Sequence, residues 1–397
     1  MSEESTKLNL QKSERPHIAF FGCRNAGKSS VVNAFTNQNL SVVSEYKGTT
    51  TDPVLKSMEL LPLGPVVIID TAGIDDSGEL GNLRIEKTKQ VLDKTDIAVL
   101  VVDINLGINS EDQNLIKIFN EKHIPYVIVF NKTDLIEINN YKKKKDALYV
   151  SAKNNLGINE LKDRIGSLIN NNKEEKFIIR DKLNRGDVVI LVIPIDESAP
   201  KGRIILPQQN TLREILDAEA VAICCQPAEL DSIIKRITPK LVITDSQAYQ
   251  EVNKIVPDNI MLTSFSVLMA RYKGNLKKLS ESANKLSNLK DGDKILISEG
   301  CTHHRQCNDI GTVKFPDWIK NFTNKKIEFD FTQGGEFPAD LTKYSLIIHC
   351  GGCMLNEAEM KSRMQHAKEQ NIPIVNYGMA IAYMNGILER AMQIFKD

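Results

Sequence analysis

The sequence lacks the features that would point to a membrane, an export route or a nucleic-acid surface. No apolar run approaches the roughly 20 residues that a membrane-spanning helix needs. The N-terminal stretch MSEESTKLNLQKSERP is polar and has no apolar segment of the secretory type. The 51 basic and 51 acidic side chains give a net charge of zero, so no general attraction to nucleic acid or anionic membranes is expected. We therefore expect a cytoplasmic protein that binds neither.

Cysteine is also scarce, with seven residues among 397. In a cytoplasmic chain these are expected to be reduced thiols, metal ligands or core residues rather than disulfides. Cys23, Cys224 and Cys225 lie in or beside apolar runs, and this placement predicts small buried side chains. A second group, near the C-terminal end, has histidines beside it and is considered below.

Short apolar runs alternate with helical patterns along the chain, which predicts an α/β protein. Continuous valine and isoleucine runs are typical of parallel strands buried on both faces, and we expect strands at 17–22, 66–70, 97–103, 126–130, 188–195, 220–225, 241–245, 294–300, 326–331, 344–350 and 373–377. Helices are expected between them, at 28–37, 211–219, 229–237 and 250–256 among others. A polar stretch at 170–176 and a new βα series near Asp291 predict three domains, at 10–172, 180–272 and 275–397.

The best-defined pattern follows the first predicted strand. Residues 22–29, GCRNAGKS, match the G-x-x-x-x-G-K-[ST] pattern of a phosphate-binding loop that opens a helix. Lys28 is expected to reach the β- and γ-phosphates, and the Ser29 hydroxyl is expected to bind magnesium. The predicted phosphate-binding residues are Asn25, Ala26, Gly27, Lys28, Ser29 and Ser30.

Two further segments are expected to complete the magnesium and γ-phosphate site. Asp70 ends the strand at 66–70 and can hold the magnesium shell, and the N–H of Gly73 can contact the γ-phosphate. Thr50 lies in a polar loop before that strand, and its hydroxyl is the expected magnesium ligand in the GTP state, with Thr49 as the alternative. The predicted catalytic residues are Lys28, Thr50 and Gly73.

A third set of residues predicts guanine as the base. Asn131, Lys132 and Asp134 follow the strand at 126–130. The Asp134 carboxylate can accept from the ring N–H and the exocyclic amine of guanine, a pair that adenine does not offer. Ser151, Ala152 and Lys153 are expected to lie beside the base. These patterns in order predict a GTPase.

The GTPase segment resembles GTPases of the TrmE and Era type, over roughly residues 10–170. Ile74 occupies the position where Ras-type enzymes place a water-orienting glutamine, and isoleucine cannot orient water. The resemblance implies that Asn25 helps to hold a potassium ion against the phosphates, where the ion stabilises charge as an arginine finger does. No water-orienting residue is assigned.

The second cysteine group lies at the ends of two predicted strands. Cys301 and His303 follow the strand at 294–300, and His349, Cys350 and Cys353 end the strand at 344–350. Open α/β sheets place their ligands at such strand ends. Three sites fit these residues: a structural zinc site, a redox C-x-x-C pair, or an iron–sulfur cluster held by three cysteines with one iron open to another ligand.

C-x-H followed by H-C-x-x-C behind a TrmE-like GTPase resembles the HydF family of FeFe-hydrogenase maturation GTPases, over nearly the whole chain. The resemblance implies a GTPase domain, a middle dimerisation domain and a domain that binds a 4Fe-4S cluster through Cys301, Cys350 and Cys353, with His303 and His349 as candidate ligands. It also implies a homodimeric scaffold that receives a di-iron precursor from the radical-SAM maturases HydE and HydG and delivers it to the apo-hydrogenase HydA.

The alternative is a GTPase of tRNA modification or ribosome assembly with a structural zinc site. A basic RNA-binding face would favour it, but the C-terminal segment has no stripe of Arg and Lys with interleaved aromatic residues. The sequence therefore favours the maturation scaffold, with GTP, magnesium and potassium in its first domain.

Overall fold

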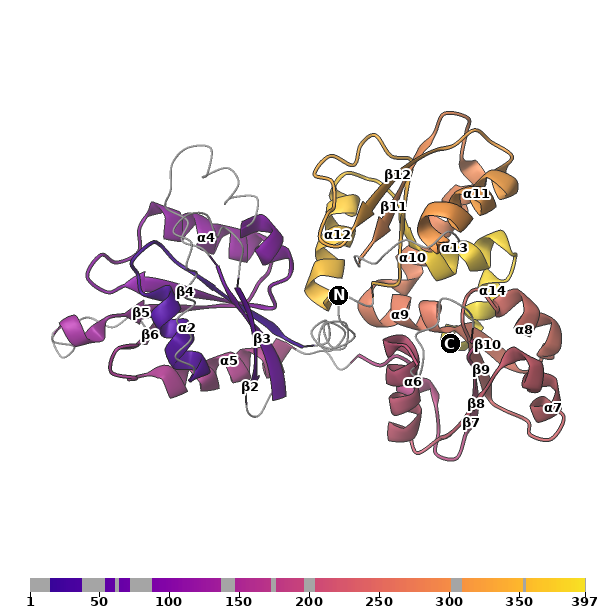
Figure 1. Cartoon of the computed structure of the whole chain (residues 1–397), viewed down its shortest axis with the longest axis horizontal. Coiled ribbons are helices and arrows are strands. Elements are labelled where there is room, and N and C mark those ends of the chain that lie inside the picture. Colours follow the sequence, from indigo (N-terminus) through magenta and orange to yellow (C-terminus); the bar gives the residue numbers. More distant parts are fainter. Residues whose placement is uncertain are drawn as a thin grey trace. The chain divides into compact units, whose positions relative to one another are not determined.

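The computed structural model describes residues 15–37, 54–60, 64–71, 88–136, 147–172, 176–195, 204–300, 309–352 and 355–396. Its contacts divide the chain into two compact units, residues 1–174 and 175–397 (Figure 1). Among the described residues, no helix is long and apolar enough to cross a membrane.

The first unit contains a six-stranded sheet in the order β2-β3-β1-β4-β5-β6. β2 runs antiparallel to β3, and the other neighbours are parallel. The strands are β1 (His17–Phe21), β2 (Val54–Leu60), β3 (Gly64–Asp70), β4 (Ile97–Asp103), β5 (Tyr126–Asn131) and β6 (Ala147–Tyr149). The predicted strands at 17–22, 66–70, 97–103 and 126–130 are thus confirmed.

Helices cover both faces of this sheet (Figure 1). Alternate residues of β1 point to opposite faces, so Phe20 packs in one core and Phe21 in the other. The helices α2 and α5 contribute to the first core and α4 to the second. Their bounds are α2 (Lys28–Thr36), α4 (Ser110–Glu121) and α5 (Ile158–Asn172).

The sequence analysis did not find β2. Its sequence VLKSMEL mixes apolar and polar residues, and Ser57 and Glu59 are exposed. The strand lies at the edge of the sheet, where only one side pairs with a neighbour. An edge strand therefore needs no continuous apolar run, and the pattern used for the central strands does not detect it.

The second unit contains two four-stranded parallel sheets, β10-β9-β7-β8 and β12-β11-β13-β14. The first consists of β7 (Val188–Val192), β8 (Val221–Cys225), β9 (Leu241–Thr244) and β10 (Met261–Ser264). The second consists of β11 (Lys294–Glu299), β12 (Glu328–Gln333), β13 (Leu346–His349) and β14 (Ile374–Asn376). The predicted strands of both series are confirmed, and β10 is added to them.

Nine helices lie among the described residues of this unit: α6 (Leu206–Asp217), α7 (Leu230–Ile234), α8 (Tyr249–Ile255), α9 (Phe265–Lys273), α10 (Leu276–Ala283), α11 (Phe315–Thr323), α12 (Glu357–Glu369), α13 (Tyr377–Met384) and α14 (Leu388–Ala391). The predicted helices at 211–219, 229–237 and 250–256 correspond to α6, α7 and α8. The structure is therefore α/β throughout, as predicted.

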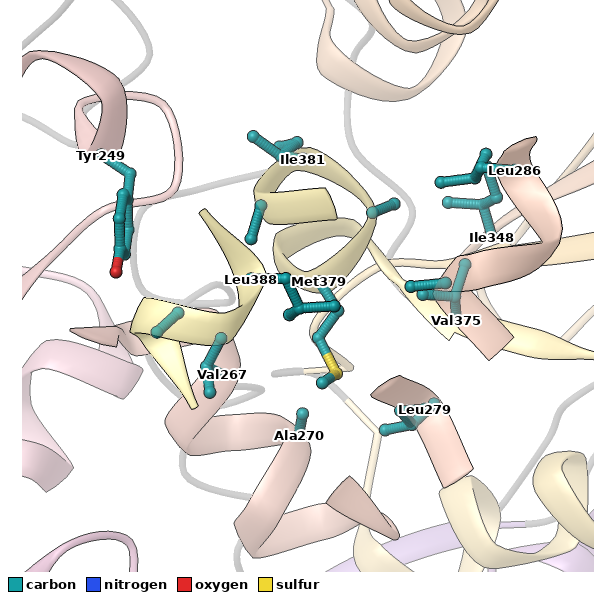
Figure 2. Packing of buried hydrophobic residues seen from close by; sticks show 14 of the residues in the cluster. Tyr249, Val267, Ala270, Leu279, Leu286, Ile348, Val375, Met379, Ile381 and Leu388 are labelled. Carbon is teal, nitrogen blue, oxygen red and sulfur yellow. The ribbon is translucent and has the colours of Figure 1, made fainter. Parts of the chain in front are cut away.

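One hydrophobic core joins the two sheets of the second unit. Val267 and Ala270 of α9 belong to the same cluster as Met379 of α13 and Ile348 of β13 (Figure 2). α14 also packs on the first sheet, where the Thr263 hydroxyl donates to the carbonyl of Ala391 at 2.8 Å. The segments at 180–272 and 275–397, which the sequence analysis separates, therefore share buried contacts.

β8 lies at an edge of its sheet and is incompletely covered. Cys224 is exposed, and Cys225 is half-buried. The prediction that both are buried is wrong for Cys224, because β8 is an edge strand with one strand neighbour and is only partly covered. Cys23, at the phosphate-binding loop, is also only half-buried.

Candidate functional site

The phosphate-binding loop joins β1 to α2 and depends on glycine. Gly27 has φ +82°, and a Cβ at this position would overlap the side-chain amide of Asn131. A Cβ at Gly22 would overlap the carbonyl of Val101. Asn25 also lies in the left-handed region, with φ +65°. The pattern of residues 22–29 therefore has a geometric cause, and the loop lies at the C-terminal end of β1 as predicted.

The predicted magnesium and phosphate residues meet beside this loop. The Lys28 ammonium is buried and donates to the Asp70 carboxylate and to the Thr71 carbonyl. The Ser29 hydroxyl donates to the same carboxylate at 3.1 Å. A carboxylate and a hydroxyl at this distance are the oxygen ligands that magnesium prefers. Lys28 supplies a positive charge at the N-terminus of α2, where phosphate groups bind.

The predicted base-binding residues form one hydrogen-bonded group. The Asn131 amide donates to the carbonyl of Ala26 at 3.1 Å and accepts from the backbone N–H of Ala152 at 3.1 Å. Asn131 is almost fully buried, with 3% of its surface exposed. It therefore ties the phosphate-binding loop to the segment that follows β6.

Asp134 is oriented by a neighbouring hydroxyl. Ser151 donates to its carboxylate at 2.7 Å, and this bond, more than any other contact, lowers the pKa of Asp134 below its ordinary value. The positive charges of Lys153 and Lys132 act in the same direction. The carboxylate is therefore ionised at neutral pH and accepts hydrogen bonds only, which is the state that guanine recognition requires.

Lys132 is held in place by a carboxylate. It lies in the left-handed region, with φ +68°, and its ammonium donates to Asp103 at 2.7 Å. Burial raises the pKa of Asp103, but the hydrogen bonds from Lys132 and Asn105 outweigh it and keep that pKa below its ordinary value. Asp103 was not among the predicted residues, although its place at the end of β4 could have suggested it.

Several predicted residues lie outside the described part of the chain. In the nucleotide site these are Thr49, Thr50, Gly73 and Ile74. In the cysteine–histidine group they are Cys301, His303 and Cys353. Their predicted roles stay predictions.

The second candidate site lies at the C-terminal ends of β11 and β13, which are neighbours in their sheet. The Cys350 sulfur accepts from the backbone N–H of Gly300 at 3.0 Å and from that of Gly352 at 3.4 Å. Gly352 has φ +63°, which glycine adopts without strain. The structure therefore brings Cys350 against the residue that precedes Cys301, as the two strand ends predicted.

Two N–H donors aimed at one sulfur suit a metal-bound thiolate, because such bonds stabilise negative charge on sulfur. The donor set at Cys350 thus fits an iron–sulfur cluster or another thiolate-bound metal. No group of three or more His, Cys, Asp and Glu side chains within the described ranges is arranged to hold a metal ion. Two of the three predicted cysteine ligands are outside those ranges.

His349 is buried, and both of its ring nitrogens have hydrogen-bond partners. Nδ1 lies 2.8 Å from the carbonyl of Cys350, and Nε2 lies 3.0 Å from Nη1 of Arg363. Burial, and then the Arg363 charge, lower the pKa of His349 to about 3. The ring is therefore neutral, with Nδ1–H donating to the carbonyl and Nε2 accepting from the guanidinium.

Arg363 of α12 was missed by the sequence analysis. Its guanidinium is 4% exposed and also donates to Glu359 at 3.0 Å and to the carbonyl of Gly334 at 2.6 Å. α12 is rich in charged residues, and such a sequence predicts a solvent-exposed helix. The sequence therefore gave no indication that one of its arginines is buried. Arg363 fixes the imidazole that precedes Cys350.

Family models match three stretches of the chain. Residues 17–132 match the model described as 50S ribosome-binding GTPase. Residues 178–274 match the Hydrogen maturase F dimerization domain, and residues 277–394 match the Hydrogen maturase F tetramerization domain. The last two stretches together span more than half of the chain.

Curated relatives match the GTPase segment. GTPase Der of Kosmotoga olearia is 32% identical over 169 residues, which are 37% of this chain and 37% of that protein. The tRNA modification GTPase MnmE of Helicobacter acinonychis is 37% identical over 131 residues, or 33% of this chain and 29% of that protein. The chain thus spans about a third of the length of these relatives.

Solved structures with similarity to this chain include Era in complex with MgGDPNP and nucleotides of 16S ribosomal RNA. That match has 21% identity and a TM-score of 0.33, and it covers 58% of this chain and 91% of Era. The G domain of the FeoB iron transporter of T. maritima has 21% identity and a TM-score of 0.30 and covers 39% of this chain and 99% of that domain.

Proposed function

Because the chain belongs to the hydrogen maturase F family, we propose that it is a GTP-hydrolysing scaffold in the assembly of the FeFe-hydrogenase active-site cluster. It receives a di-iron precursor from the maturases HydE and HydG and transfers it to the apo-hydrogenase HydA. The observation that supports this most directly is the combination of the described phosphate-side and base-side nucleotide residues with a Cys350 sulfur that accepts two backbone N–H donors in the second unit.

GTP binding is supported by the pairing of Lys28, Ser29 and Asp70 on the phosphate side and of Asp134 with Ser151 on the base side. Magnesium would be held by Ser29 and Asp70, with Thr50 as the further ligand. Lys28 neutralises charge that develops on the β- and γ-phosphates during hydrolysis. Thr50 and Gly73 are proposed to contact the γ-phosphate.

Hydrolysis is proposed to depend on potassium. Asn25 is exposed in the phosphate-binding loop, with its backbone in the left-handed region. A potassium ion there would supply the positive charge that an arginine finger supplies in other GTPases. Turnover is expected to be faster in potassium than in sodium, and Asn25→Ala should remove the difference. Equal rates in the two salts for the wild type would contradict the potassium site.

The 4Fe-4S cluster is proposed to be bound by Cys301, Cys350 and Cys353. The cluster supplies an iron that is not held by cysteine and can bind an incoming group. The chain's own contribution is the pair of N–H donors to the Cys350 sulfur and the buried His349–Arg363 pair that fixes the end of β13. Since both ring nitrogens of His349 are bonded within the protein, we propose that His349 orients this segment and that His303 is the better candidate for a ligand.

Iron and sulfide analysis of anaerobically purified protein, together with its absorption and paramagnetic resonance spectra, tests the cluster. One 4Fe-4S cluster per chain is expected, and single Cys→Ser changes at the three positions should each destabilise it and stop hydrogenase activation. Stoichiometric zinc without uptake of iron and sulfide would contradict the proposal. That result would favour the alternative, a tRNA-modification or ribosome-assembly GTPase with a structural zinc site.

A homodimer is proposed to form through the first sheet of the second unit. β8 is an edge strand, and Val221 is 48% and Leu216 of α6 is 56% exposed. Pairing of two β8 strands would extend the sheet and cover these apolar side chains. The descriptions of the two matched family models name dimerization and tetramerization, which supports assembly of more than one chain.

A further inference from the structure

A buried lysine lies beside the predicted cluster site. Lys273 is the last residue of α9, and 4% of its surface is exposed. Its ammonium donates to the carbonyl of Gly352 at 3.3 Å and to the carbonyl of Leu355 at 3.1 Å. These two carbonyls are on either side of Cys353 in the chain. One side chain therefore binds the backbone before and after a predicted ligand.

Lys273 also shares a pocket with Cys350. The pocket is lined by Lys273, His349 and Cys350 and by apolar side chains that include three methionines, Met269, Met360 and Met364. Apolar walls keep water away and reduce the screening of charge. The ammonium therefore acts strongly on groups at Cys350, and its burial requires compensating partners.

The contact joins two parts of the second unit. Lys273 lies within the stretch that matches the dimerization model, residues 178–274. Gly352 and Leu355 lie within the stretch that matches the tetramerization model, residues 277–394. Because α9 also packs in the core under the first sheet, the position of Lys273 depends on that sheet.

We propose that Lys273 is the positioning residue of the backbone at Gly352 and Leu355, beside the predicted cluster site. It holds the carbonyls of Gly352 and Leu355 and places one positive charge in the pocket that Cys350 lines. This role rests on the proposed cluster. A positive charge next to a cluster stabilises its reduced, more negative state, so Lys273 raises the reduction potential of the bound cluster.

The first test uses the protein without its cluster and measures backbone hydrogen exchange. Lys273→Met keeps an unbranched side chain of similar length but removes the charge and the donors. The amides of Gly352 and Leu355, which are hydrogen-bonded in the wild type, should exchange at least about tenfold faster in this variant. Lys277→Met, an exposed lysine on α10, is the matched control and should exchange as the wild type does.

The second test uses the reconstituted protein. Lys273→Met should lower the midpoint potential of the cluster and shorten its survival in the presence of an iron chelator by about tenfold, as loss of an outer-shell partner does. Lys277→Met should change neither. Lys273→Gln has an uncharged amide donor in place of the ammonium. It should restore part of the slow exchange, while the midpoint potential stays as low as in Lys273→Met. The Gln variant replaces the Met variant in both tests if the Met variant does not fold.

The two tests separate this role from the cluster itself. If the wild type takes up no iron and sulfide, the proposed function fails, and the exchange experiment still decides whether Lys273 orders the backbone at Gly352 and Leu355. If Lys273→Met matches Lys277→Met in exchange and in midpoint potential, Lys273 is not a positioning residue and the inference is overturned.

Discussion

At the scale of single residues, both sites depend on side chains that bind other side chains. Asp134 is oriented by Ser151, and His349 is oriented by Arg363. In each pair the first residue lies at the site, and the second fixes its direction and protonation state. A substitution of Ser151 is therefore expected to act through Asp134, and a substitution of Arg363 through His349.

Asp134→Asn should change the nucleotide preference from guanine to xanthine. The wild-type carboxylate accepts two hydrogen bonds, whereas an amide donates one and accepts one, which matches the xanthine ring. GTP affinity should fall by about 100-fold, because one of the two guanine donors then faces the amide NH2 instead of an acceptor. Fluorescent nucleotide titration measures this change. Ser151→Ala is the milder control, and equal turnover of ATP and GTP by the wild type would contradict the assignment of the base.

Arg363→Met should destabilise the second unit by about 3 kcal/mol, because Glu359 would be left as a buried carboxylate without its partner. The single tryptophan, Trp318, lies in this unit and reports its unfolding in denaturant. Adding Glu359→Gln to Arg363→Met should recover much of the loss. If the double variant is as unstable as the sum of the two single variants, the ion pair does not explain the effect.

The residues found from sequence are those whose role requires a fixed spacing. Gly22, Gly27 and Lys28 were found because the loop geometry allows few other residues at these positions. Arg363 and Lys273 were missed because each binds a residue that is distant in the sequence. The sequence pattern of their helices predicts only an amphipathic or solvent-exposed helix. Their partners are defined only by the folded chain.

At the scale of elements, side chains of α9 and α6 bind the segment that begins the second unit. Arg271 of α9 donates to the carbonyls of Phe177 and Ile178, both at 3.1 Å, and to the Asp181 carboxylate at 2.7 Å. Glu214 of α6 accepts from the N–H groups of the same segment. The polar contacts of two helices therefore fix where the segment after 175 enters the fold.

Asp181→Asn should weaken the contact with Arg271 in a pH-dependent way. Burial raises the pKa of Asp181, but its bonds with Arg271 outweigh burial and keep the pKa below the ordinary value. The stabilisation is therefore present above the ordinary pKa and is lost as the pH falls through the folded value. The variant should be less stable by about 1 kcal/mol at neutral pH. In denaturant unfolding the difference should shrink below about pH 4; a gap that is constant with pH would exclude this cause.

Ala222→Pro should dissociate the proposed dimer without unfolding β8. The N–H of Val221 donates to the carbonyl of Asp187 on the β7 side, so the N–H of the next residue points to the free edge. Proline removes that outward donor and is tolerated at sheet edges. Light scattering should report the mass of one chain. Ala222→Thr keeps the N–H and should remain dimeric; if both variants keep the wild-type mass, β8 is not the interface.

Elements were predicted best where burial leaves a strong pattern. The central strands β1, β4 and β5 are continuous apolar runs, and each was found. The same rule led to the wrong expectation for Cys224, because an apolar strand at an edge keeps one side uncovered. The pattern shows that a strand prefers apolar contact but does not show whether the contact lies within the chain or with a second copy.

At the scale of the whole molecule, the two units are expected to function without sharing residues. The nucleotide residues lie before residue 174, and the predicted cluster residues lie after 175. Lys28→Ala should abolish GTP hydrolysis in sodium and in potassium while iron and sulfide content stay at the wild-type level. Conversely, Cys350→Ser should lose the cluster and keep GTP turnover. Loss of cluster in Lys28→Ala would show that nucleotide binding is needed for assembly.

The packing of α14 has a consequence for biosynthesis. Arg390 donates to the carbonyls of Val256 and Pro257, and Ile394 packs in the core under β7 and β9. The two Arg390 bonds span 134 and 133 positions of the chain, and Ile394 contacts strands that are still earlier in the sequence. While the second sheet is still being synthesised, part of the apolar surface of the first sheet stays exposed to solvent. Chaperone binding to nascent chains should therefore persist until residues 388–395 have left the exit tunnel, whereas the GTPase unit can fold as soon as it emerges.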